Sequence, residues 1–192
     1  MTHAATKRAL DLAGATFGLL LLCPLILLVA LTIAIVDGRP AFFRQIRVGR
    51  DERLFSLWKL RSMRKGTENV ATHLASRQSV TRLGAILRRT KLDELPQLWN
   101  VFRGEMSLVG PRPCLPTQAD VIQARRRHGV QSQRPGITGL SQISGYEFAT
   151  PEETAALDAE YAANASLAGD LALILRTVLG LSKDNADARM SD

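Results

Sequence analysis

Two neighbouring carboxylates, Asp93 and Glu94, lie in a basic segment and directly precede Leu95 and Pro96. The residue before a proline favours extended geometry, so a turn at this point could aim both carboxylates at one small volume. The surrounding cationic side chains are expected to keep both groups ionised. One carboxylate could then attack phosphorus and form an acyl phosphate, while the other holds a hard cation. The alternative is that both acids only compensate the dipole at the start of a helix.

Basic side chains suited to phosphate accompany this acidic pair. Of the 25 basic residues 20 are arginine, whose planar guanidinium favours bidentate recognition of phosphate or carboxylate. The candidate phosphate-binding residues are Lys59, Arg61, Arg88 and Arg112. Arg112 stands between Pro111 and Pro113, and a guanidinium on such a rigid loop loses little conformational freedom when it binds an oxyanion. The three consecutive arginines at 125–127 instead predict a solvated helix face or a contact with lipid headgroups.

Charge is distributed unevenly along the 192 residues, whose formal net charge is +7. Residues 1–38 are neutral overall, residues 39–134 carry +13 and residues 135–192 carry −6. The middle segment is therefore expected to handle anions, first of all phosphate. An aromatic content of only 5% argues against a stacking platform for nucleic acid, and we expect no nucleic-acid partner. P-loop, GxGxxG and HExxH motifs are absent, so neither a P-loop nor a dinucleotide-binding turn is predicted.

The 25 residues from 12 to 36 carry no charge, and at about 1.5 Å per residue they could cross a hydrocarbon layer of roughly 30 Å. Pro24 removes a backbone donor in the middle of this segment and is expected to bend or break a helix there. Lys7 and Arg8 precede the segment and Arg39 follows it. Positive charge marks the cytoplasmic side, so basic residues at both ends predict a hairpin that enters and leaves on one face. A kinked helix that spans the membrane is the alternative.

The predicted organisation is a membrane segment, residues 1–38, followed by one cytoplasmic unit, residues 39–192. The expected elements are a β-hairpin (41–43 and 54–60), a loop or weak helix (66–78), a basic amphipathic helix from Val80, a short helix from Pro96 to about Arg103 that Gly104 ends, a rigid loop (109–113) and two helices (151–164 and 167–181). The fold class is therefore α+β and predominantly helical, with amphipathic helices able to lie in a membrane interface.

A family resemblance rests mainly on residues 91–113, KLDELPQLWNVFRGEMSLVGPRP. This stretch resembles the signature of the bacterial sugar transferases, the monotopic phosphoglycosyl transferases. Three further segments match in the expected order along nearly the whole chain: Lys7-Arg8 with Asp11, KLRSM at 59–63 and RPGITGL at 134–140. Cys23 departs from the pattern, because a small polar residue such as Ser is expected before the proline. The chain resembles the minimal form of the family.

This resemblance implies an enzyme on the cytoplasmic face of the bacterial plasma membrane. It would move a sugar 1-phosphate from a UDP-sugar to polyprenol (undecaprenyl) phosphate and release UMP, in the first membrane step of surface glycan biosynthesis. Asp93 would attack the β-phosphorus and hold the phosphosugar covalently, and Glu94 would bind Mg²⁺. The residues implied to orient phosphates or the nucleotide are Lys59, Arg61, Arg88 and Pro111-Arg112-Pro113. The membrane segment would be a re-entrant helix broken at Pro24.

Two other classes of function stay open. A membrane-tethered protein that binds nucleic acid or anionic lipid would use the +13 segment only as an electrostatic surface and would be indifferent to Asp93. A non-catalytic scaffold of a glycan assembly complex would tolerate Asp93→Asn and Glu94→Gln. The transferred sugar, the glycan pathway and the oligomeric state are left open by these residues.

Overall fold

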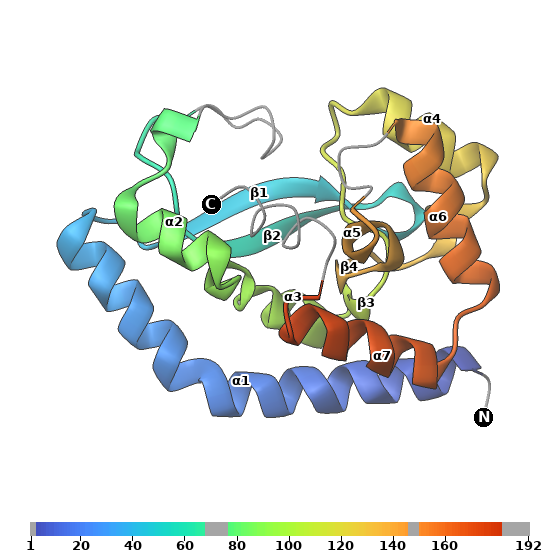
Figure 1. Ribbon diagram of the computed structural model, residues 1–192, viewed down its shortest axis with the longest axis horizontal. Coiled ribbons are helices and arrows are strands. Elements are labelled where there is room, and N and C mark those ends of the chain that lie inside the picture. The colour runs from blue at the N-terminus through green and yellow to red at the C-terminus, as the bar shows by residue number, and fades with distance from the viewer. Residues whose placement is uncertain (1–2, 68–76, 146–149, 182–192) are drawn as a thin grey trace.

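A long apolar helix, α1 (His3–Val36), runs along one side of an α+β body in the computed structural model (Figure 1). The structure describes residues 3–67, 77–145 and 150–181. Most of the segment 66–78, expected to be a loop or weak helix, lies outside the described residues. The predominantly helical α+β class predicted from the sequence is confirmed.

α1 is the one helix in the described ranges that is long and apolar enough to cross a membrane. Pro24 lies inside the helix, which bends partway along its length yet stays helical to Val36, so the break predicted at Pro24 is wrong and the segment is one bent helix (Figure 1). A proline removes one helical hydrogen bond and crowds the preceding turn, which accounts for a bend. Large apolar side chains exposed along α1 are Phe17, Leu20, Leu21, Leu27, Leu28, Leu31 and Ile35. Such a surface is suited to contact with lipid.

The N-terminal end of α1 is bonded to the body at several points. Lys7 Nζ lies 2.5 Å from Asp170 Oδ2 in α7 (Leu167–Val178). The buried Asp11 carboxylate accepts hydrogen bonds from Ser107 Oγ at 3.0 Å and from the Leu108 amide at 2.9 Å. These charge-assisted contacts fix this end of the helix against the body.

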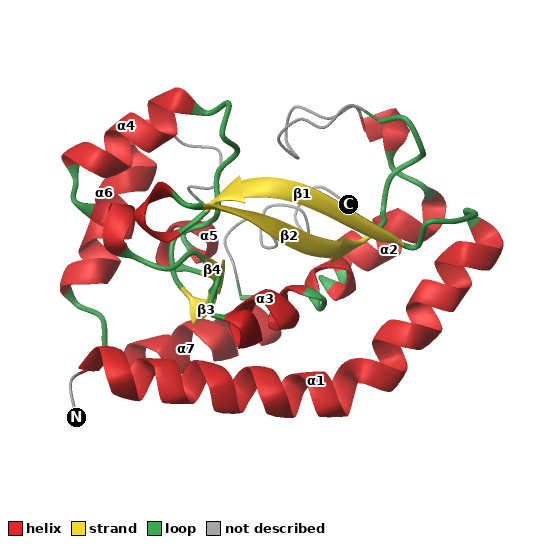
Figure 2. Ribbon diagram, turned by 180° about the vertical axis from the view of Figure 1, so that it is seen from behind, coloured by secondary structure: helices red, strands yellow, loops and turns green. Residues whose placement is uncertain are grey.

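The C-terminal end of α1 is bonded to the same body. Arg61 Nη2 donates to the carbonyl oxygens of Asp37 and Gly38, which directly follow the helix. Thr81 Oγ1 donates to Asp37 Oδ2 at 2.8 Å. With both ends held by one body, the bent helix has its two ends on the same side, and this arrangement supports the re-entrant topology predicted from the sequence (Figure 2).

The predicted β-hairpin is confirmed and is longer than expected. β1 (Phe42–Val48) pairs antiparallel with β2 (Leu54–Leu60), and η1 (Arg50–Glu52) forms the turn between them. Phe55 and Leu57 of β2 are buried with Ala15 of α1 and Val101, in a core that joins the hairpin to the long helix. This packing positions the end of β2, where Lys59 is located.

The remaining helical elements include the four predicted helices, at 82–89, 97–103, 151–163 and 167–178, together with several that were not predicted. They are η2 (Arg77–Ser79), α2 (Arg82–Arg89), η3 (Leu92–Glu94), α3 (Gln97–Arg103), α4 (Ala119–Arg127), η4 (Val130–Ser132), α5 (Leu140–Ile143), α6 (Pro151–Ala163) and α7. Thr81 caps α2 by accepting from the Gly84 amide, and Gly104, at φ 82°, ends α3 as expected. α6 begins with a capping box between Thr150 and Glu153.

A short parallel pair was not predicted. β3 (Ser107–Val109) lies beside β4 (Gly136–Thr138), with Ser107 opposite Gly136. Three-residue strands carry too little alternation to be recognised from sequence. The pair extends into the proline-rich loop, because the Gly136 amide donates to the Pro111 carbonyl at 2.9 Å.

The arginines at 125–127 form intramolecular ion pairs rather than a free basic face. Arg125 Nη2 lies 2.8 Å from the buried Asp158, and Arg127 Nη2 lies 2.6 Å from Glu152. Arg126 pairs with Glu52 of η1. Arg126 and Arg127 are more than half exposed, so the predicted solvated helix face is confirmed for these two, while Arg125 is largely buried against Asp158.

The attachment of both ends of α1 predicts a topology that cysteine labelling can measure. Ala5→Cys and Arg39→Cys, each in a Cys23→Ser background, place single exposed thiols at the two ends of the helix. A membrane-impermeant maleimide should modify both positions in inverted inner-membrane vesicles and neither position in intact cells. Cys114 is buried and serves as the internal control for unfolding. Labelling of one position from each side would establish a spanning helix instead.

Candidate functional site

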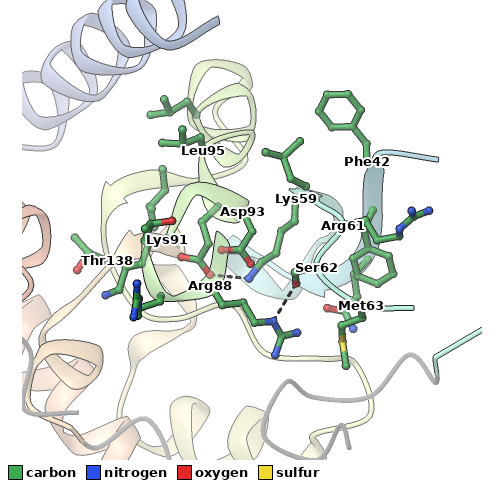
Figure 3. A pocket seen from close by; sticks show the side chains of 18 of the residues that line it. Phe42, Lys59, Arg61, Ser62, Met63, Arg88, Lys91, Asp93, Leu95 and Thr138 are labelled. Atoms are coloured by element: carbon green, nitrogen blue, oxygen red, sulfur yellow. Dashed lines mark hydrogen bonds and ion pairs between the residues drawn. The ribbon is translucent and has the colours of Figure 1, made fainter. Parts of the chain in front are cut away.

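A cleft of about 1250 Å³ brings together the end of β2, the α2–η3 segment, the loop after β3 and α7 (Figure 3). Asp93 and Glu94 line it, together with Lys59, Arg88 and Arg112. Gly18 and Leu22 of α1 form part of its wall, so the cleft reaches the apolar helix. The sequence-predicted acidic pair and most of its predicted cationic partners therefore share one site.

Asp93 and Glu94 lie in the 3₁₀ turn η3 rather than in an extended turn. Leu95, before the proline, has φ −53° and ψ −36°, so the extended geometry expected here is wrong. Lys91, at φ 56°, reverses the chain between α2 and η3. The tight turn still directs both carboxylates into the cleft. Asp93 is 7% exposed. Compensation of a helix dipole does not explain this burial, because an exposed acid would compensate the dipole equally well.

Glu94 forms an ion pair with Lys59, whose Nζ lies 2.6 Å from Glu94 Oε1. Burial alone would raise the pKa of Glu94. The positive charges of Lys59 and Arg112, with the hydrogen bond from Lys59, outweigh that effect and lower the pKa to about 2. Glu94 is therefore ionised throughout the physiological range.

The pKa of Asp93 is shifted in the opposite direction. Burial raises its pKa to about 6, and the neighbouring charge of Glu94 acts in the same direction, while Lys59 and Arg88 oppose the rise. The expectation that nearby cations hold both carboxylates ionised is met at Glu94 but not at Asp93, where desolvation dominates. Two adjacent carboxylates thus acquire different acidities, a pattern typical of groups with different chemical roles.

A residue of α3, Asn100, positions the strand that carries Lys59. The fully buried Asn100 accepts from the Trp58 amide at 3.1 Å and donates to the Ser56 carbonyl at 2.7 Å. These bonds align β2 on α3, which directly follows the turn that carries Glu94. Sequence analysis missed Asn100, because a lone asparagine in an amphipathic pattern carries no signal of its long-range partners.

Arg88 is held against the segment that follows β2. Its Nε donates to Ser62 Oγ at 2.9 Å (Figure 3). Gly84 allows this approach of α2, because a Cβ there would lie 1.9 Å from the Ser62 carbonyl oxygen. A side chain at this position would push α2, and with it Arg88, away from the cleft.

Arg112 is supported by a buried layer beneath its loop. Pro111 and Pro113 are buried and do not line the cleft, so they shape the loop rather than face a ligand. Arg47 Nη1 donates to the Pro113 carbonyl at 3.0 Å. Burial, and then the charge of Arg112, lower the pKa of Arg47 to about 10. Arg47 was not singled out from the sequence, where nothing distinguishes it from other arginines.

Arg61 also lines the cleft, yet its side chain extends away from Asp93 and Lys59 (Figure 3). It lies toward Phe42 and the end of α1. The four cations predicted to act together therefore divide into three near the acidic pair and one on another wall of the cleft.

The acidic pair fits a divalent cation that arrives with a substrate. Carboxylate oxygens are the donors that Mg²⁺ prefers, and Mg²⁺ is commonly held by one or two carboxylates plus phosphate oxygens. The described residues contain no group of three or more His, Cys, Asp or Glu side chains that could hold a metal ion. Glu94, with its low pKa, is the ionised ligand such an ion requires.

Comparison with known proteins identifies a family. Residues 2–184 match the model described as bacterial sugar transferase. The UDP-glucose:undecaprenyl-phosphate glucose-1-phosphate transferase of Caulobacter vibrioides is 43% identical over 190 residues, covering 94% of this chain and 71% of that protein. The exopolysaccharide production protein ExoY of Rhizobium meliloti is 36% identical, covering 90% and 83%. The galactosyl transferase CpsE of Streptococcus agalactiae is 37% identical, covering 92% of this chain and 42% of the longer relative.

The opposite pKa shifts predict opposite effects of neutralising the two carboxylates on stability. Asp93→Asn should raise Tm at pH 8, because the wild-type carboxylate is ionised while buried, at a cost of about 3 kcal/mol or less. For a chain of this size that corresponds to about 2–4 °C per kcal/mol. The gain should shrink below pH 6 and vanish below about pH 3, where Asp93 is protonated in both the folded and the unfolded state.

Glu94→Gln is the matched control and should lower Tm at pH 8, because Lys59 loses its buried partner. Glu94 has a lowered pKa, so its contribution is complete above about pH 4.5 and is lost only as pH falls toward 2. The deficit should therefore persist at pH 5. Thermal unfolding in detergent at pH 5, 6.5 and 8 measures both variants. Equal effects of the two substitutions would contradict the assigned shifts.

Proposed function

This chain belongs to the bacterial sugar transferase family and is a phosphoglycosyl transferase, and on that basis we propose its reaction. It transfers a sugar 1-phosphate from a UDP-sugar to undecaprenyl phosphate and releases UMP. The names of its relatives, which include a UDP-glucose:undecaprenyl-phosphate glucose-1-phosphate transferase, support this assignment. The observation that carries it is the buried Asp93 beside the Lys59–Glu94 ion pair in a cleft that reaches α1.

The first step uses Asp93 as nucleophile. A carboxylate oxygen attacks the β-phosphorus of the UDP-sugar, and the bond from that phosphorus to the bridging oxygen breaks. UMP leaves with the electron pair, and the phosphosugar stays on Asp93 as an acyl phosphate. The pKa of about 6 supports this role, because the carboxylate is largely ionised at neutral pH yet more basic than an ordinary aspartate.

The second step regenerates the carboxylate. A phosphate oxygen of undecaprenyl phosphate attacks the phosphorus of the intermediate, and the bond to the Asp93 oxygen breaks. The product carries the sugar on a lipid-linked diphosphate. Lys59 and Arg88, whose charges stabilise ionised Asp93, favour its departure as a carboxylate.

The remaining cations are assigned to the donor. Arg112, on its supported loop, and Arg88, on α2, bind and orient the oxygens of the diphosphate. Glu94 holds Mg²⁺, which when bound supplies positive charge to offset that of the diphosphate. Lys59 orients Glu94 through the ion pair.

The site belongs where water meets lipid, because one substrate is soluble and the other is buried in a bilayer. α7 exposes Leu171, Leu175 and Val178, and Leu179 directly after it is exposed as well. An amphipathic helix with such a face lies in a membrane interface. We assign this interface to the cytoplasmic face, where nucleotide sugars are available, and the reaction to the first membrane step of surface glycan biosynthesis.

A purely electrostatic function has less support. A membrane-tethered protein that binds polyanions depends on uncompensated positive charge, and the charges of the arginines at 125–127 are each offset by a paired carboxylate. Neither that function nor a scaffold explains why a carboxylate is buried at the side of an ion pair. Both alternatives predict that the neutral variants of the acidic pair keep their biological role.

The central test measures UMP release by the purified protein in detergent with undecaprenyl phosphate, Mg²⁺ and a panel of UDP-sugars. Wild type should release UMP from at least one of them. Asp93→Asn should lower turnover by more than about 1000-fold, as expected for loss of a nucleophile. Intact-mass spectrometry without acceptor should detect one added phosphosugar on wild type and none on the variant. Full activity of Asp93→Asn would exclude the covalent mechanism.

The acidity of Asp93 predicts a pH dependence. kcat/KM for the UDP-sugar should rise about tenfold per unit below pH 6 and level off above it, because only the carboxylate attacks. Lys59→Met removes a charge that lowers the pKa of Asp93, so this limb should move to higher pH. Lys91→Met is the control, since the Lys91 charge acts on Glu94. A limb that stays in place in Lys59→Met would contradict the assignment.

A further inference from the structure

The Arg61 guanidinium is buried and uses only part of its hydrogen-bonding capacity. The side chain is 7% exposed, and its Nε and Nη1 atoms have no hydrogen-bond partner among the residues that the structure describes. Only Nη2 is bonded, to the carbonyl oxygens of Asp37 and Gly38. Within the described part of the chain, no carboxylate forms an ion pair with Arg61. Burying a charged donor without a partner is costly, so such a group indicates an anion that the free protein lacks.

The position of Arg61 separates it from the cations around the acidic pair. Its side chain extends away from Asp93 and Lys59, toward the junction at which α1 ends (Figure 3). Lys59 is already paired with Glu94, and Arg88 with Ser62. Arg61 is thus the buried cation of this cleft that is anchored to the membrane helix rather than to the catalytic turn.

The walls beside Arg61 are apolar. Pro40, Phe42 and Phe43 line this part of the cleft, and both phenylalanines are more than a third exposed. Leu22 and Gly18 of α1 also line the cleft. An anion bound here would therefore have hydrocarbon surface next to it, continuous with the helix that enters the membrane.

We propose that Arg61 binds the phosphate of the acceptor lipid, a polyprenol phosphate, while Arg88 and Arg112 bind the donor. This inference rests on the proposed function for the identity of the lipid. The phosphate monoester supplies the acceptors that Nε and Nη1 lack, and the isoprenoid chain lies against the apolar wall and α1. The acceptor phosphate and the nucleophile then share one cleft but have separate cationic partners. The acceptor therefore does not compete for the cations that act on Asp93.

A purely structural role makes different predictions. In that role Arg61 only binds the carbonyls that follow α1, and its loss would lower stability and affect both substrates alike. In the proposed role, loss of the side chain weakens one substrate selectively. Substrate-specific constants, rather than overall activity, therefore discriminate between the two.

The test compares Arg61→Gln and Arg61→Lys with Arg88→Lys as the matched control. KM for undecaprenyl phosphate should rise about 10-fold or more in Arg61→Gln, the effect expected for loss of charge-assisted hydrogen bonds. Arg61→Lys keeps the charge and should show a smaller rise, which also guards against misfolding of the neutral variant. KM for the UDP-sugar and the rate of adduct formation without acceptor should change less than about twofold. Arg88→Lys should do the reverse and slow adduct formation.

A direct binding measurement tests the inference without requiring turnover. Wild type and Arg61→Gln are titrated with undecaprenyl phosphate in detergent, and separately with phosphatidylglycerol vesicles. Selective loss of undecaprenyl phosphate binding in the variant supports the inference even if the UMP assay fails and the proposed reaction is wrong. Equal loss of phosphatidylglycerol binding would identify a general headgroup contact and overturn it. Unchanged binding and unchanged acceptor KM, or equal rises in both KM values, would overturn it as well.

Discussion

Burial of the Asp93 carboxylate is the constraint on which the site depends. Taking a carboxylate out of water disfavours its ionised form, and the protein compensates only in part, with charges on Lys59 and Arg88. The same cations cannot stabilise both members of an adjacent pair fully, and Lys59 bonds directly to Glu94. The result is one strongly acidic carboxylate suited to a cation and one basic carboxylate suited to attack. Different acidities thus arise from a difference in contacts, although the two residues are neighbours in sequence.

The attachment of α1 decides where this chemistry takes place. Lys7 and Asp11 hold one end of the helix, and Arg61 and Thr81 hold the carbonyls and carboxylate just after the other end. A helix fixed at both ends to one body brings its apolar middle near the cleft, an arrangement that suits the proposed re-entrant topology. The bend at the proline allows this, and the cleft wall formed by Leu22 shows how close the membrane segment comes. The apolar helix α1 and the cleft that holds the acidic pair therefore belong to one folded unit.

Local features of this chain were predictable from the sequence, and long-range ones were not. The hairpin, the helix ended by Gly104 and the bend expected at Pro24 follow from residue types whose preferences act within a few positions. The parallel pair β3–β4 and the partners of Arg125 depend on segments more than 25 residues apart. The extended turn before Pro96 was wrong, because the tertiary position of η3 overrode the local preference of Leu95. At the site, the acidic pair and its cations were recognised, but their burial was not, and burial determines the acidity of Asp93.

In the proposed two-step transfer, a pKa near 6 for Asp93 is a compromise between two demands. A nucleophile gains reactivity as its basicity rises, whereas a leaving group departs more easily as its basicity falls, and in the proposed mechanism Asp93 acts as both in turn. A fully exposed aspartate would leave well but attack poorly, and an aspartate buried without cations would be protonated at neutral pH. Lys59 and Arg88 hold the group between these limits. In this proposal the cations near Asp93 tune the covalent step, and a separate cation for the acceptor phosphate, Arg61, leaves that balance unchanged.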